Sequence, residues 1–193
     1  MSVCSQTLSG YEYSRCSDGG NGGIKEVYIA LRSDLANTAG SDYDGAVTIT
    51  SGAISAINLA VPASTPFHRF KFKRETTAMT STGEVADNGS SSWSTEVSIV
   101  FPRMSTAKRT SMMSLFLADT VVIVRDANDE YHYLGIDYPV NATAGGAETG
   151  TAIADANQYT LTLTDVAYQA PFMLNASAIT ALAAMIATES QNN

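Results

Sequence analysis

Polar and apolar residues alternate along much of this chain, and the alternation predicts a protein built mainly of β-strands. Residues 94–101 alternate polar and apolar side chains, as a strand with one buried face does. Residues 121–124 form an unbroken β-branched run, which predicts a strand buried on both faces. A turn at 127–129 leads into an aromatic strand at 131–136. With a helix between the first two strands, residues 93–137 form the packing module around which we expect the domain to be organised.

The same pattern predicts further strands on both sides of this module. They lie at 24–32, at 46–50 and 53–61 as a hairpin, and at 158–164 as the last strand. Residues 66–80 predict a long strand that pairs antiparallel with the one at 91–101. In a regular register this long strand has a basic face and a largely aromatic face. The first face holds Phe67, Arg69, Lys71 and Lys73, and the second holds His68, Phe70, Phe72 and Arg74.

Two helices are predicted. Ser105 is a typical N-cap for a helix that runs to about Leu117. We expect one face of this helix to pack on a sheet, formed by Ala107, Thr110, Met113, Phe116 and Leu117. A short C-terminal helix is capped by Asn175 or Ser177, and Ile179, Leu182, Ala183 and Ile186 lie on one side of it.

The remaining segments are polar and rich in small residues. Residues 1–23 end in a glycine-rich run, which predicts a flexible N-terminal arm. Residues 80–92 predict a turn or mobile loop, and 141–157 a long surface loop or arm. We expect a β-rich domain at 24–175, followed by a C-terminal helix and tail at 176–193. The predicted fold is mainly β (α+β): a β-sandwich or small barrel with one packed internal helix and a short C-terminal helix.

Charge is unevenly distributed along the 193 residues, whose net charge is −8. Eight acidic side chains and no Lys or Arg follow Arg125, whereas seven of the eleven basic residues lie between Arg69 and Arg109. A subunit with one acidic and one basic region suits head-to-tail contacts between copies. The alternative is a solvated acidic surface with scattered basic side chains.

The chain offers little catalytic chemistry. His68 and His132 both lie in aromatic strands, and no Gly-x-Ser-x-Gly motif places a nucleophile beside either one. Cys4 and Cys16 could close one loop, but without a secretory signal we expect free thiols. We therefore predict a non-enzymatic protein with no catalytic or cofactor-binding residues.

Acidic turns hint at calcium without matching a calcium loop. The turn at 126–130 has Tyr131 where an EF-hand needs Gly, so a hairpin turn is the favoured explanation. The acidic residues around Asp42 and Asp44 receive the same interpretation, and no metal site is predicted. The longest mostly apolar run, 178–187, is too short to span a bilayer, so no membrane partner is expected.

A basic set of residues could contact nucleic acid phosphates. The chain as a whole is acidic and lacks specific readout motifs, and contact with an acidic face of another copy explains these residues equally well. The set consists of Arg69, Lys71, Lys73, Arg74, Arg103, Lys108 and Arg109.

Several motifs together resemble a known family. The spacing of Cys4, Gly10-Tyr11, Cys16 and the run at 22–29 resembles the opening of a family of virion structural proteins from tailed phages of Bacteroides and related hosts. The resemblance continues at 72–76, 94–97, 100–101, 104, 107–109, 133–135, 149–151 and 159–163, and so covers most of the chain.

This resemblance implies a tail component of tail-tube type, located in the virion and assembled in the host cytoplasm. Such proteins form six-fold rings that stack into a tube, contact other tail proteins, and let DNA pass through a β-lined lumen without specific binding. The long strands at 66–80 and 91–101 could line this lumen, although the basic face of the first does not suit it. A ring or adaptor protein of a short-tailed phage is the alternative, and an extracellular binding module is a more distant one.

Overall fold

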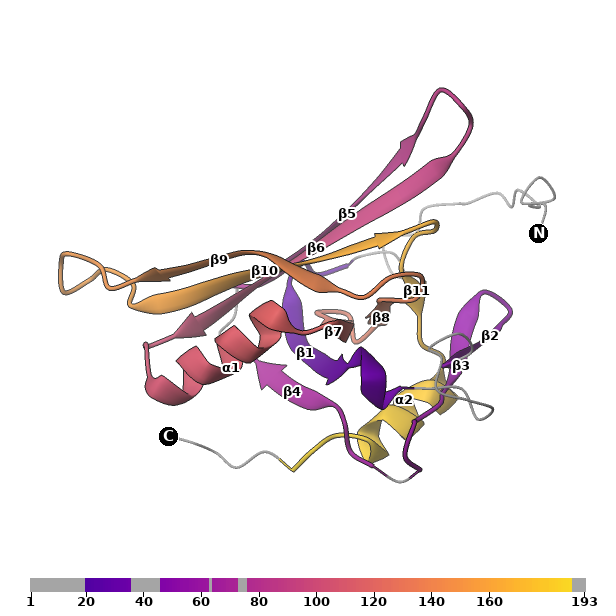
Figure 1. Ribbon diagram of the computed structural model, residues 1–193, viewed down its shortest axis with the longest axis horizontal. Helices are drawn as coiled ribbons and strands as arrows, with labels where there is room; N and C mark the ends of the chain where they lie inside the picture. Colours follow the sequence, from indigo (N-terminus) through magenta and orange to yellow (C-terminus); the bar gives the residue numbers. More distant parts are fainter. Residues whose placement is uncertain (1–19, 36–45, 63, 73–75, 189–193) are drawn as a thin grey trace.

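The computed structural model describes residues 20–35, 46–62, 64–72 and 76–188. Within these residues two antiparallel sheets pack face to face as a β-sandwich, and two helices lie beside and below them (Figure 1). The predicted fold class is therefore confirmed. No helix of the described residues is long and apolar enough to cross a membrane.

The central sheet has five strands in the order β11-β8-β7-β1-β4. Its strands are β1 (Ile24–Leu31), β4 (His68–Lys71), β7 (Thr120–Asp126), β8 (Tyr131–Leu134) and β11 (Phe172–Met173). Residues 121–124 in β7 are fully buried, as their β-branched run predicts. A 3-10 turn, η2 (Arg32–Asp34), follows β1.

The long sheet has four strands in the order β5-β6-β10-β9. Its strands are β5 (Ala78–Val85), β6 (Ser91–Pro102), β9 (Asn141–Glu148) and β10 (Gln158–Ala167). Every second residue of β6 and β10 is buried, because one face of this sheet covers the central sheet and the other does not.

The central sheet has a hydrophobic core on each face. Val27 and Val124 face the long sheet, where they meet Val97 and Leu163. Tyr28 and its neighbours on the other face pack against α2 (Ala176–Ala184) and a separate hairpin of β2 (Val47–Thr50) and β3 (Ala53–Ile57). Burial on both faces explains why β1 and β7 are so rich in apolar residues.

The internal helix α1 (Thr106–Leu117) forms where it was predicted, but its packed side differs. Ser105 caps it by accepting a hydrogen bond from the Lys108 N–H. Met112 and Leu115 pack against the core beside the long sheet, whereas Met113, Phe116 and Leu117 of the predicted packed face are exposed. Of the predicted face, Phe116 still meets the sheet, at Gly145 of β9. The other four members, Ala107, Thr110, Met113 and Leu117, are exposed, so the predicted face as a whole is wrong.

In α2 the predicted cap is confirmed, since the Asn175 side chain accepts a hydrogen bond from the Ala178 N–H. Leu182 is buried as expected, and Ala178 is buried beside it. Ala183, which was placed on the same side, is exposed.

Four predicted segments differ from the structure. The strand at 66–80 divides into β4 in the central sheet and β5 in the long sheet, so the chain changes sheet within it. The loop predicted at 80–92 is the greater part of a hairpin formed by β5 and β6. Residues 141–148 of the predicted 141–157 loop form strand β9, which pairs with β10. The strand at 158–164 extends to Ala167 and is followed by β11.

Candidate assembly surfaces

The outer face of the long sheet is lined with hydroxyl groups. Threonines and serines stand in cross-strand register on it: Thr162 is opposite Ser98, and Ser94 is opposite Thr82. Glu96 lies between Thr164 of β10 and Thr80 of β5. None of the residues in the four strands is Lys or Arg. This surface, the hydroxyl face, is therefore mainly polar and, where it is charged, acidic; Val100 and Val166 are its larger apolar side chains.

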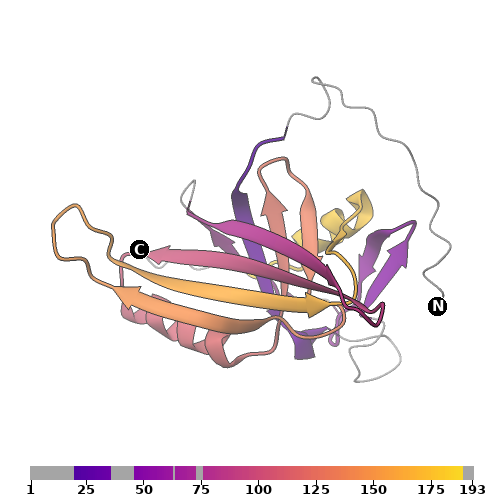
Figure 2. The same cartoon turned by 90° about the horizontal axis from the view of Figure 1, so that it is seen from above.

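No described helix covers the hydroxyl face. Seen from above, the four strands lie side by side in front of the rest of the molecule (Figure 2). Helix α1 packs on the opposite face of this sheet, since the Phe116 ring lies 3.3 Å from where a Cβ on Gly145 would stand. Gly145 is opposite Leu161, a core residue of the inner face.

Both edges of the long sheet are open within the described part of the chain. Strands β5 and β9 each have eight residues, and no described strand pairs with the outer edge of either one. Neither strand contains Pro or Lys, the residues with which natural proteins usually protect sheet edges. The two edges are therefore suited to pairing with another strand.

An apolar patch lies on α1, which packs beside the β9 edge. Met113 and Phe116 are each about two-fifths exposed, and Leu117 is 81% exposed. Exposed large apolar side chains that cluster on one element are typical of interaction sites. A strand added at β9 would approach this patch, because Phe116 contacts β9 at Gly145.

The β5–β6 hairpin extends beyond the body of the protein as a twisted ribbon (Figure 1). Residues 80–90 are exposed, and Val85 near the tip is 78% exposed. Trp93 lies across Gly83, its partner on the neighbouring strand: a Cβ on Gly83 would be 2.8 Å from the indole ring. Because Gly83 has no side chain, the ring of Trp93 can lie flat on the ribbon.

The two histidines do not form a common site. His68 lies on β4 and His132 on β8, and strands β1 and β7 separate them. His132 Nε2 is 3.6 Å from Asp126 Oδ2, an ion pair when the histidine is protonated. The expected absence of a catalytic site stays a prediction.

The acidic turn at 126–130, which connects β7 and β8, is a hairpin turn, as the sequence predicted. The Asp126 carboxylate accepts hydrogen bonds from the backbone N–H groups of Asn128 and Glu130 at 2.8 and 2.9 Å. Burial raises the pKa of Asp126, but these bonds outweigh it and hold the pKa below its usual value. Asp129 takes the left-handed backbone at φ 70° and pairs with Lys25 and Arg125.

In the described residues no group of three or more His, Cys, Asp or Glu could hold a metal ion. Asp42 and Asp44, like Cys4 and Cys16, lie outside these residues.

The predicted basic set does not form one patch. Lys71 pairs with the buried carboxylate of Glu26 in β1, and Arg125 of β7 pairs with the same carboxylate. Lys71 therefore helps to neutralise a buried charge of the central sheet. Lys108 donates to the carbonyl groups of Pro102 and Arg103 where β6 turns into α1. Since β4 belongs to the central sheet, its basic residues do not lie on the hydroxyl face. Lys73 and Arg74 lie outside the described residues.

Asp165 is a residue that the sequence analysis missed. It is 4% exposed and points inward from β10. The strand was predicted to end at 164, but the alternation of Leu161 and Leu163 continues through Asp165 to Ala167, and this signal could have revealed a carboxylate on a buried face.

Comparison with known proteins gives little further information. No family model matches this chain, and no curated protein matches it in sequence. Among solved structures, it has a weak likeness to a chain of a structure described as the virion of a native gene transfer agent (GTA) particle. The likeness has a TM-score of 0.34 and 14% identity, over 52% of this chain and 84% of the other. A TM-score of this size carries no conclusion about function, which therefore rests on the surfaces of this chain.

Proposed function

We propose that this chain is a non-enzymatic structural subunit of a phage tail. It self-assembles into six-fold rings that stack head to tail as a tube, through which the genome passes. The observation that carries the proposal is the hydroxyl face of the long antiparallel sheet, which no described helix covers. The four strands contain no Lys or Arg, and both edges of the sheet are open within the described residues.

The hydroxyl face has the chemistry that a DNA channel needs. DNA carries a dense negative charge, so Lys or Arg on a channel wall would bind it. Hydroxyl groups with a few glutamates, such as Glu84 and Glu96, leave the wall wet and weakly repulsive. We therefore assign this face to the lumen of the proposed tube, through which DNA passes without specific binding.

The strand order of the long sheet supports ring closure through its edges. All three neighbouring pairs in the order β5-β6-β10-β9 are antiparallel, so β9 runs opposite to β5. A second copy related by rotation then places its β5 antiparallel beside β9, and the sheet continues from copy to copy. This pairing brings the second copy toward the exposed Met113, Phe116 and Leu117 of α1.

A ring or adaptor protein of a short-tailed phage is the second candidate. The same open edges would close a ring in either case, and the difference is whether rings stack on one another or bind other tail proteins. An extracellular binding module is favoured less, because Trp93 is the only Trp and lies flat on Gly83.

Negative-stain electron microscopy of the purified protein, with native mass spectrometry, tests the proposal. We expect rings and stacked tubes, and native masses at multiples of six subunits. Rings that never stack would favour the adaptor. A monomer at every concentration would overturn self-assembly as the function.

A further inference from the structure

A small acidic cavity opens at the end of the sandwich where the chain crosses from β10 to β11. Its volume is about 140 Å³. Asp165, Asp137 and Ile49 line it, from β10, the segment after β8 and the β2–β3 hairpin respectively. Asp165 is 96% buried, since 4% of it is exposed, and its Oδ1 has no hydrogen-bond partner among the described residues. A buried carboxylate oxygen that lines a cavity in this way is set to accept a donor from outside.

The charges around the cavity leave a negative balance. The titratable groups that face Asp165 are Arg32, after β1, and Asp137, after β8. Arg32 is also held by the fold, because its Nη2 donates to the Asp137 carbonyl at 3.3 Å. With both carboxylates ionised, two negative charges face one positive charge. Burial raises the pKa of Asp165 to about 6, the Gly135 N–H and Arg32 oppose this rise, and Asp137 adds to it. At neutral pH, which is above this pKa, both carboxylates are ionised and these three side chains have a net charge of −1.

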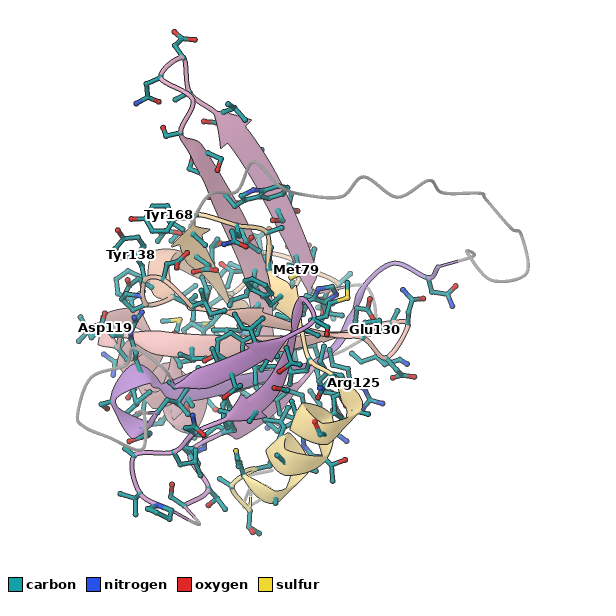
Figure 3. All side chains as sticks on the ribbon, turned by 90° about the vertical axis from the view of Figure 1, so that its right-hand side faces the viewer. Met79, Asp119, Arg125, Glu130, Tyr138 and Tyr168 are labelled. Carbon is teal, nitrogen blue, oxygen red and sulfur yellow. The ribbon has the colours of Figure 1, made fainter. Side chains whose placement is uncertain are left out.

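Two tyrosines stand beside the cavity and add to its preference for a cation. Tyr138 and Tyr168 contact each other with hydroxyl oxygens 2.7 Å apart and ring centroids 5.9 Å apart. They lie together at the surface, on the side that Figure 3 turns toward the viewer. The Tyr168 N–H donates to the Asp137 carboxylate at 2.9 Å, which connects the pair to the cavity. Aromatic faces beside carboxylates favour a guanidinium over a neutral donor.

The opposite end of the long sheet carries two exposed arginines, Arg103 and Arg109, which we call the arginine corner. Neither guanidinium pairs with a carboxylate among the described residues. Arg103 has the left-handed backbone at φ 60°, and its N–H donates to the Asn157 carbonyl at 2.7 Å. A non-glycine residue held in this conformation is unusual, and such residues often occur at functional sites.

A copy cannot fill its own cavity with its own arginine corner. Arg103 adjoins Asn157, and Asp165 lies eight residues further along an extended segment, a separation of about 25 Å at the usual rise per residue. An arginine side chain spans only a small part of this distance. The two sites therefore meet only between copies.

We infer that the arginine corner of one copy docks into the Asp137–Asp165 cavity of a copy in the next ring, and that this contact sets head-to-tail stacking. The inference rests on the proposed function and names the residues of its stacking contact. The occupant is a second copy, because the chain carries complementary charges at opposite ends of one sheet.

Charge reversal tests the inference. The first variant is Arg103→Glu with Arg109→Glu, and the second is Asp137→Lys. Each alone places like charges at the contact, so we expect rings that stack about ten-fold more weakly or worse than wild type. Arg69→Glu is the matched control, since Arg69 is also exposed and has no carboxylate partner among the described residues. This control should stack as wild type does.

Mixing the two variants in equal amounts distinguishes a stacking contact from a folding defect. Opposite charges then meet when rings of the two variants alternate, so tubes should return in electron micrographs of the mixture and not of either variant alone. Variants that stack like wild type, or a mixture that stays as separate rings, would overturn the inference while leaving ring assembly intact. Wild-type protein that forms no rings would overturn the proposed function, and the inference with it.

Discussion

At the scale of single residues, two positions depart from the usual pattern. Asp165 is a buried carboxylate, and Gly83 is a glycine crowded by the Trp93 ring. Asp165 places a carboxylate on the inner face of β10, where Leu161 and Leu163 fill the core. Thr95, its partner on β6, is buried too, and its hydroxyl lies 2.8 Å from that of Ser81. The inner face thus changes from apolar to polar toward one end, and the acidic cavity lies at that end.

Asp165→Asn should stabilise the fold at pH 7.5. The folded pKa of about 6 is above the ordinary 3.8, so the folded state holds this proton more tightly than the unfolded state. The stabilising effect of the proton is present below about pH 4 and is lost as the pH rises through 6. A pKa difference of about two corresponds to about 3 kcal/mol. Between pH 4 and 7.5, the unfolding free energy of the variant should therefore rise by up to that amount relative to that of wild type.

Urea unfolding followed by Trp93 fluorescence measures this difference, at dilutions where the protein is monomeric. Unfolding free energies are measured at pH 5.0 and at pH 7.5. The difference in unfolding free energy between variant and wild type should be larger at pH 7.5. An equal difference at both values would show that Asp165 does not titrate as a buried acid.

Gly83→Ala should disturb the ribbon of β5 and β6. The added Cβ would stand 2.8 Å from the Trp93 ring, so the indole has to move away. We expect a loss of about 1 kcal/mol in unfolding free energy and a red shift of the Trp93 emission. Gly22→Ala is the control, because a Cβ there meets nothing within 4 Å. Unchanged emission in Gly83→Ala would contradict the packing of Trp93 on this glycine.

At the scale of elements, the sequence predicts most strands and both helices, because alternation, β-branched runs and caps act locally. It does not predict the change of sheet between Lys71 and Ala78, because β4 and β5 share the same alternation and differ only in their distant partners. Strand β9 was missed for a related reason: its Ala and Gly residues have low strand propensity, and pairing with β10 holds them.

The face of α1 that was predicted to pack on the sheet, and is largely exposed, bears on the proposed assembly. Apolar spacing selects the side with Met113, Phe116 and Leu117, but the core of a single copy is contacted by Met112 and Leu115. Both sides of the helix are thus partly apolar, as expected for a helix that packs on its own sheet and on a neighbour.

Leu117→Lys should weaken ring formation without weakening the fold. Leu117 is 81% exposed, so the substitution should change the unfolding free energy by no more than about 0.5 kcal/mol. In the assembly it would place a charge in a buried apolar contact. Sedimentation velocity should therefore show a shift from rings to smaller species.

Ser111→Lys is the matched control for this substitution. Ser111 is exposed on the same helix and lies about 140° around it from Phe116, at 100° per residue. Rings that form equally well in Leu117→Lys and Ser111→Lys would show that the apolar patch is not part of the ring interface.

At the scale of the whole molecule, charge and hydrogen-bonding capacity are separated in space. The hydroxyl face carries no Lys or Arg, Lys71 and Arg125 of the central sheet pair with Glu26, and the arginine corner and acidic cavity lie at opposite ends of one sheet. The uneven charge along the sequence predicted head-to-tail contact in general terms. It could not place the cavity, because Arg32, Asp137 and Asp165 are far apart in the chain and meet only in the fold.

Stacking should be more sensitive to salt than ring formation. The proposed contact between rings is ionic, and the Debye length falls from about 10 Å at 0.1 M to about 3 Å at 1 M salt. The proposed contact within a ring is backbone pairing with apolar burial, which salt screens little. Electron micrographs at 1 M sodium chloride should therefore show shorter tubes and intact rings. If tubes and rings were lost together, the two contacts would not differ in their dependence on salt as proposed.

Hydrogen–deuterium exchange tests whether copies join through the two edges of the long sheet. Assembled wild-type protein is compared with Leu117→Lys as the dissociated reference. We expect assembly to slow amide exchange in residues 78–85 and 141–148, and to leave exchange in the β2–β3 hairpin at 47–57 unchanged. Exchange at β5 and β9 that is equally fast in both states, with protection elsewhere, would contradict it.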